Sequence, residues 1–309
     1  MLTAQSFVDP WRFVLNIEVY VLVAFLVGAY VYMVRSIGPH AVAQGQPVVT
    51  RHQVGFFAAA MLVLFAASTW PIHQIGEDYL YSVHMVQHMM LSYILPPLVW
   101  FAIPEWLLRV LIGERGTYRA VRFLGKPVIA AFTFNVMVMV LHIPDLVNAS
   151  TSNAALHFSL HLFVVVSALL MWLPVVGPLP EMQMGPGAKM IYLFLQSVVP
   201  TVPAAWLTFA DGAVYKHYGQ QPVRVWGMNV TEDQQIAGVI MKIGGGFFLW
   251  GIVIYMFFKR FGVDSTTRSY RRGGTMPSAE ITGNDDFPLT FDEVNSAFDR
   301  SEAPNEPAR

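Results

Sequence analysis

Two short segments of the chain carry pairs of histidines at a spacing suited to binding a ligand. His84 and His88 lie in "HMVQHMM", and His157 and His161 lie in "HFSLH". Residues i and i+4 of a helix share one face about 6 Å apart along the axis, so each pair can present two imidazoles together. Imidazole binds copper, zinc, iron and nickel, and a thioether adds a preference for Cu(I). With a fifth histidine and three nearby methionines, the predicted ligand set is His84, His88, His142, His157, His161, Met85, Met89 and Met139.

The composition indicates that membrane helices must position these side chains. The chain has 309 residues, of which 55% are hydrophobic and 13% are charged, and it cannot cover a soluble core with polar surface. Its formal net charge of -1 argues against a broad nucleic-acid-binding surface, which needs an excess of Lys and Arg. The absence of cysteine excludes disulfides, thiolate metal sites and CxxC redox chemistry. A metal would therefore be held by histidine, methionine or carboxylate.

Seven stretches are long and apolar enough to cross a bilayer, whose hydrocarbon core of about 30 Å requires about 20 helical residues. The predicted fold is an all-α polytopic membrane protein with seven transmembrane helices. Pro96 and Pro97 fall inside the third stretch, where a kink is expected and neighbouring helices must satisfy the freed backbone groups. The predicted spans are 13 to 34, 54 to 71, 81 to 103, 128 to 144, 155 to 174, 189 to 210 and 235 to 258.

The loop charges predict an orientation, because short loops rich in Lys and Arg stay in the cytoplasm. The basic loops follow the first, third and seventh spans, whereas Glu77 and Asp78 are assigned to an external loop. This pattern puts the N-terminus outside and the C-terminus in the cytoplasm. The N-terminus lacks the basic region and cleavage site of a removable signal peptide. Residues 1–262 then form the transmembrane domain, and 263–309 form an acidic cytoplasmic tail that is expected to be mostly disordered.

This topology sorts the histidines by side of the membrane. His40 and His52 lie in the first cytoplasmic loop, and His73 and His217 lie in external loops. The five predicted ligands fall within the first turns below the outer boundary. A single intramembrane histidine often serves only to hydrogen-bond helices together, and methionines mostly fill gaps in a core. Two histidine pairs and a fifth histidine at one depth favour a ligand site over packing.

Other intramembrane polar residues have simpler interpretations. Glu18 and Lys242 each lie about two turns below the outer surface and are predicted to form an ion pair, because a charge inside the membrane usually has a partner. Asn135 and Gln196 are predicted to hydrogen-bond between helices. The "EMQM" segment at 181–184 resembles a metal motif but falls on the cytoplasmic side, so it is interpreted as an ordinary loop.

Four segments together resemble the CtaG family of cytochrome c oxidase assembly factors, the seven-helix, caa-type group. The segments are "HMVQHMMLSYILPPLVWFAIP" (84 to 104), "LHIPDL" (141 to 146), "LHFSLHLFVVVSALLMWLPVVGPLP" (156 to 180) and "DQQIAGVIMK" (233 to 242). The resemblance covers about 54 to 258. It implies a protein of the bacterial plasma membrane that helps to build the binuclear copper centre of oxidase subunit II, on the extracytoplasmic side. Its implied partners are the oxidase subunits, especially subunit II. Lys242 departs from the family pattern, where an aromatic residue, usually Trp, is expected.

Three hypotheses follow. The leading one is a non-enzymatic assembly factor that holds copper transiently at its outer face. A second is a haem-carrying electron-transfer protein, with axial histidines from different helices. A third is a copper permease, which would need ligands across the whole bilayer. No hydrolytic constellation or phosphate-binding loop is found, and the glycine run 244–246 lies within a helix, where it is expected to permit close packing.

Overall fold

The computed structural model describes residues 9–113, 115–221 and 223–273, with 261–273 as backbone only. Contacts between residues divide the chain into two units, Met1–Lys259 and Arg260–Arg309. The described part is helical and contains no strand. The helices are α1 (Ile17–Tyr32), η1 (Met33–Ile37), α2 (Gly38–Ala41), α3 (Arg51–Ser68), α4 (Ile72–Asp78), α5 (Tyr81–Met89), η2 (Met90–Ile94), α6 (Leu95–Ala102), α7 (Glu105–Ile112), α8 (Gly116–Leu124), α9 (Pro127–Val140), α10 (Pro144–Ser152), α11 (Ala154–Val176), η3 (Pro180–Met182), α12 (Pro186–Gln196), α13 (Thr201–Thr208), α14 (Lys216–Gly219), η4 (Val225–Gly227), α15 (Val230–Val239), η5 (Ile240–Gly244) and α16 (Gly245–Gly273).

The all-α membrane fold is confirmed. Six helical segments of the described chain are long and apolar enough to cross a membrane, and α8 with α9 makes a seventh if this pair, bent by 72°, counts as one span. Helix α9 alone has 14 residues, which agrees with 128 to 144 being the shortest of the seven predicted spans. Of the predicted tail, 263–273 continue α16, and 274–309 lie outside the described residues. The six segments are Ile17–Ala41, Arg51–Asp78, Tyr81–Ala102, Ala154–Val176, Pro186–Thr208 and Val230–Arg260.

The first and third spans differ most in how far they are buried in the bundle. The span Tyr81–Ala102 has a mean hydropathy of only 1.2, and 61% of its apolar window is buried. The span that begins with α1 has a mean hydropathy of 2.1 and none of its window buried. Polar side chains are costly in lipid, so the span that carries them is surrounded by protein, whereas an apolar span such as the first can face the bilayer. Helix α1 packs on α3, where Tyr30 stacks on Phe57 with ring centroids 3.9 Å apart.

The proline pair sits where a π-helical turn, η2, joins α5 to α6. Pro96 has no N–H, so in a regular helix the carbonyl of Ser92 would lack a donor. The indole Nε1 of Trp172, on α11, donates to that carbonyl at 3.0 Å. A neighbouring helix thus satisfies the freed group, as expected, and Tyr81–Ala102 continues as one span.

One predicted helix contact is confirmed, and the predicted role of the glycine run is not. Asn135 Nδ2 on α9 donates to Gln196 Oε1 on α12 at 2.8 Å. In the glycine run only Gly245 faces a neighbour: a Cβ built there would lie 3.5 Å from Met89 Sδ, whereas Gly244 and Gly246 have nothing within 4 Å. A distance of 3.5 Å is ordinary van der Waals contact, so the helix packing does not require glycine at any of the three positions.

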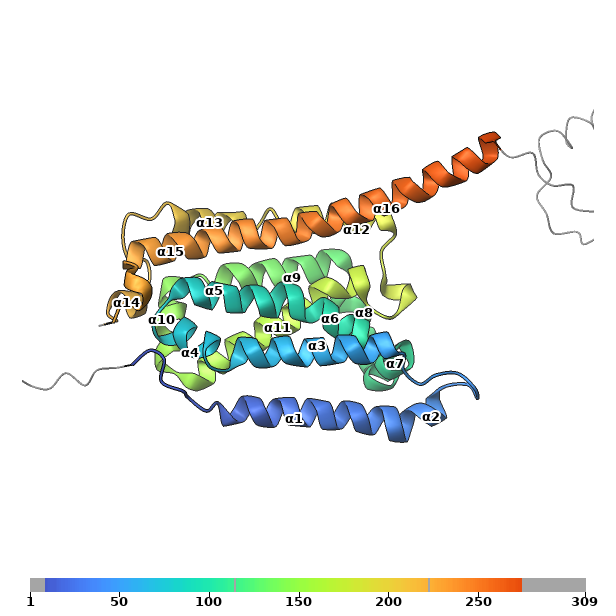
Figure 1. Ribbon diagram of the computed structural model, residues 1–309, viewed down its shortest axis with the longest axis horizontal. Helices are drawn as coiled ribbons and strands as arrows, with labels where there is room; N and C mark the ends of the chain where they lie inside the picture. Colours follow the sequence, from blue (N-terminus) through green and yellow to red (C-terminus); the bar gives the residue numbers. More distant parts are fainter. Residues whose placement is uncertain (1–8, 114, 222, 274–309) are drawn as a thin grey trace, which may run out of the picture. The chain divides into compact units, whose positions relative to one another are not determined.

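The two ends of the bundle differ in their residues. Helices α4, α10 and α14 lie at one end, and α7 and α8 lie at the other (Figure 1). The predicted histidine ligands belong to the first end. Arg109 and the other basic residues of the loop after α6 belong to the second, as does Glu181 of the "EMQM" segment, which pairs with Arg109.

Candidate metal centre

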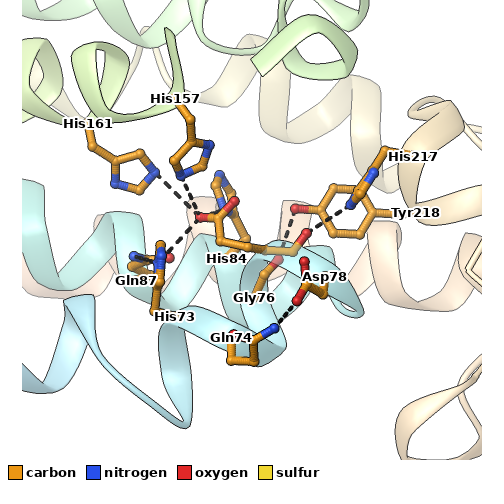
Figure 2. Close-up of polar contacts among 11 residues, drawn as sticks. His73, Gln74, Gly76, Asp78, His84, Gln87, His157, His161, His217 and Tyr218 are labelled. Carbon is orange, nitrogen blue, oxygen red and sulfur yellow. Dashed lines mark hydrogen bonds and ion pairs between the residues drawn. The ribbon is translucent and has the colours of Figure 1, made fainter. Parts of the chain in front are cut away.

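The largely buried carboxylate of Glu77 lies within 4 Å of four histidines at this end of the bundle, His73, His84, His157 and His161, which Figure 2 labels. Its Oε1 is 3.0 Å from His84 Nδ1, 3.1 Å from His157 Nε2 and 3.5 Å from His161 Nε2. His73 Nδ1 is 3.8 Å away. The Glu77 side chain is 14% exposed, and all its ion-pair partners among the described residues are histidines. No permanent cation therefore balances this carboxylate.

Glu77 and His73 were not predicted to belong to this cluster, because both residues fall in a segment that was predicted to be an external loop. In the structure α3 ends at Ser68. The helix that follows it, α4, has seven residues and packs against α5. The signal in the sequence was the spacing His73-x-x-x-Glu77, which puts both side chains on one face of a short helix. That spacing acquires meaning only once α4 lies beside the histidine pair of α5.

A glycine allows α4 to approach α5 closely. A Cβ built on Gly76 would lie 3.0 Å from the backbone nitrogen of His84 and 3.1 Å from its Cα. Backbone atoms cannot move aside as the end of a side chain can, so a larger residue would separate the two helices. Tyr218 also holds this turn: its hydroxyl donates to the Gly76 carbonyl at 2.9 Å. Close packing here brings Glu77 next to His84.

A second carboxylate anchors the start of α5. Asp233, on α15, accepts hydrogen bonds from the backbone N–H of Tyr81 at 2.7 Å and of Ser82 at 3.0 Å. These N–H groups have no partner within the helix, so Asp233 caps α5 from another span. Its neighbour Gln234 accepts from the backbone of Val214 at 2.7 Å. The "DQQ" segment thus fixes the helix that carries His84 and His88.

The structure brings all five predicted histidines to one cavity of about 30 Å³, which Glu77 and Met85 also line. Such a volume holds a water molecule or an ion. Two sets of three side chains place their ligand atoms within 4.8 Å of one another: His84 with His88 and His161, and Glu77 with His157 and His161. The Nε2 atoms of His157 and His161 are buried and lie 3.1 Å and 3.5 Å from Glu77 Oε1. These sets have the nitrogen and oxygen donors that a first-row metal takes.

Hydrogen bonds fix which nitrogen of two rings can bind a metal. His142 Nδ1 lies 2.7 Å from the carbonyl oxygen of Val138, which can only accept, so Nδ1 carries the proton and Nε2 the lone pair. His84 Nδ1 likewise donates to the Glu77 carboxylate, which leaves Nε2 as the lone-pair atom. Metal-binding histidines have this arrangement of a ligand nitrogen and an anchored N–H.

The predicted methionines separate in the structure. Met85 is 2% exposed and lines the histidine cavity. Met89 does not line it but borders a second, adjacent cavity. Met139 is 39% exposed on the surface of α9 and lines neither cavity. Its place in the predicted ligand set is corrected, because α9 turns this residue outward.

The predicted ion pair between Glu18 and Lys242 is not formed. Lys242 Nζ donates instead to Thr201 Oγ1 on α13 at 2.5 Å. Glu18 belongs to α1, which packs on α3, and Figure 1 shows α1 and α15 on opposite sides of the bundle. The two residues have similar depths along their helices, but depth does not determine which helices are neighbours.

The fold and the site define a polytopic helical membrane protein with a buried histidine–carboxylate cluster at one end of its bundle. The family model described as cytochrome c oxidase caa3 assembly factor (Caa3_CtaG) matches residues 21–261. The chain therefore belongs to the cytochrome c oxidase caa3 assembly factor family, as the resemblance implied. Comparison with curated proteins and with solved structures gave no match.

Proposed function

We propose that this protein binds copper at the cluster of Glu77, His84, His88, His157 and His161 and supplies it for the copper centre of oxidase subunit II. The observation that carries the proposal is the set of imidazole nitrogens and one carboxylate oxygen around a cavity the size of an ion. Copper is the cargo in this role, and the protein acts without catalysis. An incomplete, exchangeable ligand set suits a carrier better than a closed tetrahedral site.

The proposed side of the membrane is the extracytoplasmic one. The cluster and the basic residues of α7 and α8 belong to opposite ends of the bundle (Figure 1), and short basic loops stay in the cytoplasm. The chain lacks cysteine, so single cysteines introduced at exposed positions report the topology. In bacterial cells, Asp211→Cys should react with a membrane-impermeant maleimide and Thr117→Cys should not. The reverse labelling would overturn this orientation.

The alternatives receive less support from the geometry. Three imidazole rings lie close together. Their centroids are 4.4 Å apart for His84 and His88, 5.0 Å apart for His88 and His161, and 5.8 Å apart for His84 and His161. A haem would require these rings to separate and admit a flat macrocycle. A permease would need metal ligands at successive depths across the bilayer. Among the described residues, both groups of three ligands contain His161, so they lie at a single depth.

A copper-binding measurement tests the proposal. The full chain in detergent should bind Cu(I) in competition with a chromogenic chelator, and His84→Ala/His88→Ala should reduce the affinity by at least about 10-fold. The matched control is His40→Ala/His52→Ala, which removes two exposed histidines outside the cluster. Cells carrying the first variant should contain subunit II with less copper. Equal copper binding by both double variants would refute the proposed site, and a Soret band in the purified protein would favour haem.

A further inference from the structure

A second cavity, of about 20 Å³, adjoins the histidine cavity. Met85, His88 and His142 line both cavities, so the two spaces are neighbours. Three methionines line the second cavity, Met85, Met89 and Met241, whereas only Met85 lines the first. We call the second one the thioether cavity. Its methionines and histidines carry sulfur and nitrogen donors, and its other lining residues are apolar apart from Ser92 and Tyr93.

His142 provides the observation that points to a ligand. The residue is 7% exposed, and its Nδ1 proton is committed to the Val138 carbonyl. Its Nε2 lone pair is buried without a hydrogen-bond partner. Leaving a buried acceptor unsatisfied costs about 1–3 kcal/mol, so such an atom normally has a partner. An anchored Nδ1–H and an available Nε2 are also the arrangement of a metal-binding histidine.

The methionines gather from two helices around this position. Met85 and Met89 are four residues apart on α5, and Met241 is on η5, which packs against α5. Met85 and Met241 are 2% and 4% exposed. The sulfur of Met89 is directed to the η5–α16 side, since a Cβ on Gly245 would lie 3.5 Å from it. Buried methionines commonly only fill space, but here they share a cavity with a histidine that lacks a partner.

We propose that the thioether cavity is a second copper site, selective for Cu(I), in which His142 Nε2 and the thioethers of Met85, Met89 and Met241 hold the ion. Thioethers are soft ligands that select Cu(I), whereas the nitrogen and oxygen donors of the neighbouring cluster also accept divalent ions. His88 borders both cavities and lets an ion move between them by exchange of one ligand at a time. This inference rests on the proposed copper role of the cluster.

The test measures Cu(I) stoichiometry and the atoms that surround the metal. The full chain in detergent, titrated anaerobically with Cu(I), should bind two equivalents, and X-ray absorption at the copper edge should detect sulfur neighbours. Met89→Leu/Met241→Leu, a nearly volume-conserving change, should lose one equivalent and most of the sulfur signal. Met139→Leu is the matched control, because Met139 lines neither cavity.

Zn(II) binding separates loss of the site from loss of the fold. The double methionine variant should bind Zn(II) at the histidine cluster as the unchanged chain does; if it does not, Met241→Leu alone is measured in its place. One Cu(I) with only nitrogen and oxygen neighbours, unaffected by the methionine changes, would overturn the thioether site and leave the cluster intact. Absence of any copper binding would overturn both proposals.

Discussion

Two carboxylate clusters at opposite ends of the bundle differ in how their charge is balanced. At the basic end, Arg109 is 2.7 Å from Glu105 and 2.9 Å from Glu181, and these side chains are 47%, 50% and 35% exposed. At the other end, Glu77 is 14% exposed and meets only imidazoles. In the first cluster, the permanently charged guanidinium of Arg109 balances carboxylates that are exposed to water. In the second, the carboxylate is largely buried, and the imidazoles around it can be neutral.

This difference distinguishes a structural ion pair from a site that can bind a metal ion. A guanidinium directs its donors to both carboxylates, and nothing remains for a ligand to satisfy. A buried carboxylate among neutral imidazoles gains a counter-charge only when a proton or a metal ion arrives. The four predictions below test this contrast, from the largest expected effect to the smallest.

Removing the charge of Glu77 should have the largest effect. Glu77→Gln keeps the shape of the side chain but loses the negative charge and the carboxylate that orients His84. We expect copper affinity to fall by about 10- to 100-fold, as it does when the anchoring partner of a ligand is changed. Competition with a chromogenic chelator measures this. Glu181→Gln is the control at the basic end, and an equal loss in both variants would remove the contrast between the clusters.

Separating α4 from α5 should have the next largest effect. In Gly76→Ala the added methyl group meets the His84 backbone, and such overpacking costs about 1–3 kcal/mol. We expect a lower Tm in detergent and weaker copper binding, since Glu77 moves away from His84. The control Gly55→Ala adds a methyl group where nothing lies within 4 Å; it should leave copper binding unchanged and should not lower the Tm, because Ala favours a helix interior over Gly. Normal copper binding by Gly76→Ala would show that the position of α4 is unimportant.

The cap of α5 should matter less. Asp233 is buried like Glu77, but its oxygens accept backbone hydrogen bonds, so its role is to stabilise the helix. Asp233→Ala should cost about 0.5–2 kcal/mol, the usual loss for a helix cap, measured as a shift in thermal unfolding. Asp211→Ala, which removes an exposed carboxylate from the preceding loop, serves as the control. A copper defect without loss of stability would contradict a purely structural role for Asp233.

The smallest effect is expected at the basic end. Arg109→Gln breaks contacts to Glu105 and Glu181 that water largely screens, and exposed ion pairs contribute little to stability. We expect no measurable change in Tm or in copper affinity. A marked loss of copper binding in this variant would mean that the two ends are coupled and would break the comparison.

Local periodicity made much of the site predictable. An i, i+4 spacing fixes which side chains share a helix face whatever surrounds the helix, so His84 with His88 and His157 with His161 could be paired in advance. Their common depth followed from the span boundaries, and all five predicted histidines line one cavity. The outward position of Met139 and the partner of Lys242 were not predictable in this way, because they depend on the rotation and neighbours of each helix.

The sequence by itself determined the membrane-spanning helices, the family and the depth of the histidines, because hydropathy, motif and helical spacing are local properties. Only the tertiary structure decided that α4 folds back beside α5 and brings Glu77 to the imidazoles, that Asp233 caps α5 from another span, and that the thioethers gather beside His142. These facts depend on which helices pack together. Packing between spans is set by the fit of small residues, prolines and polar groups spread along the chain, which no single segment contains.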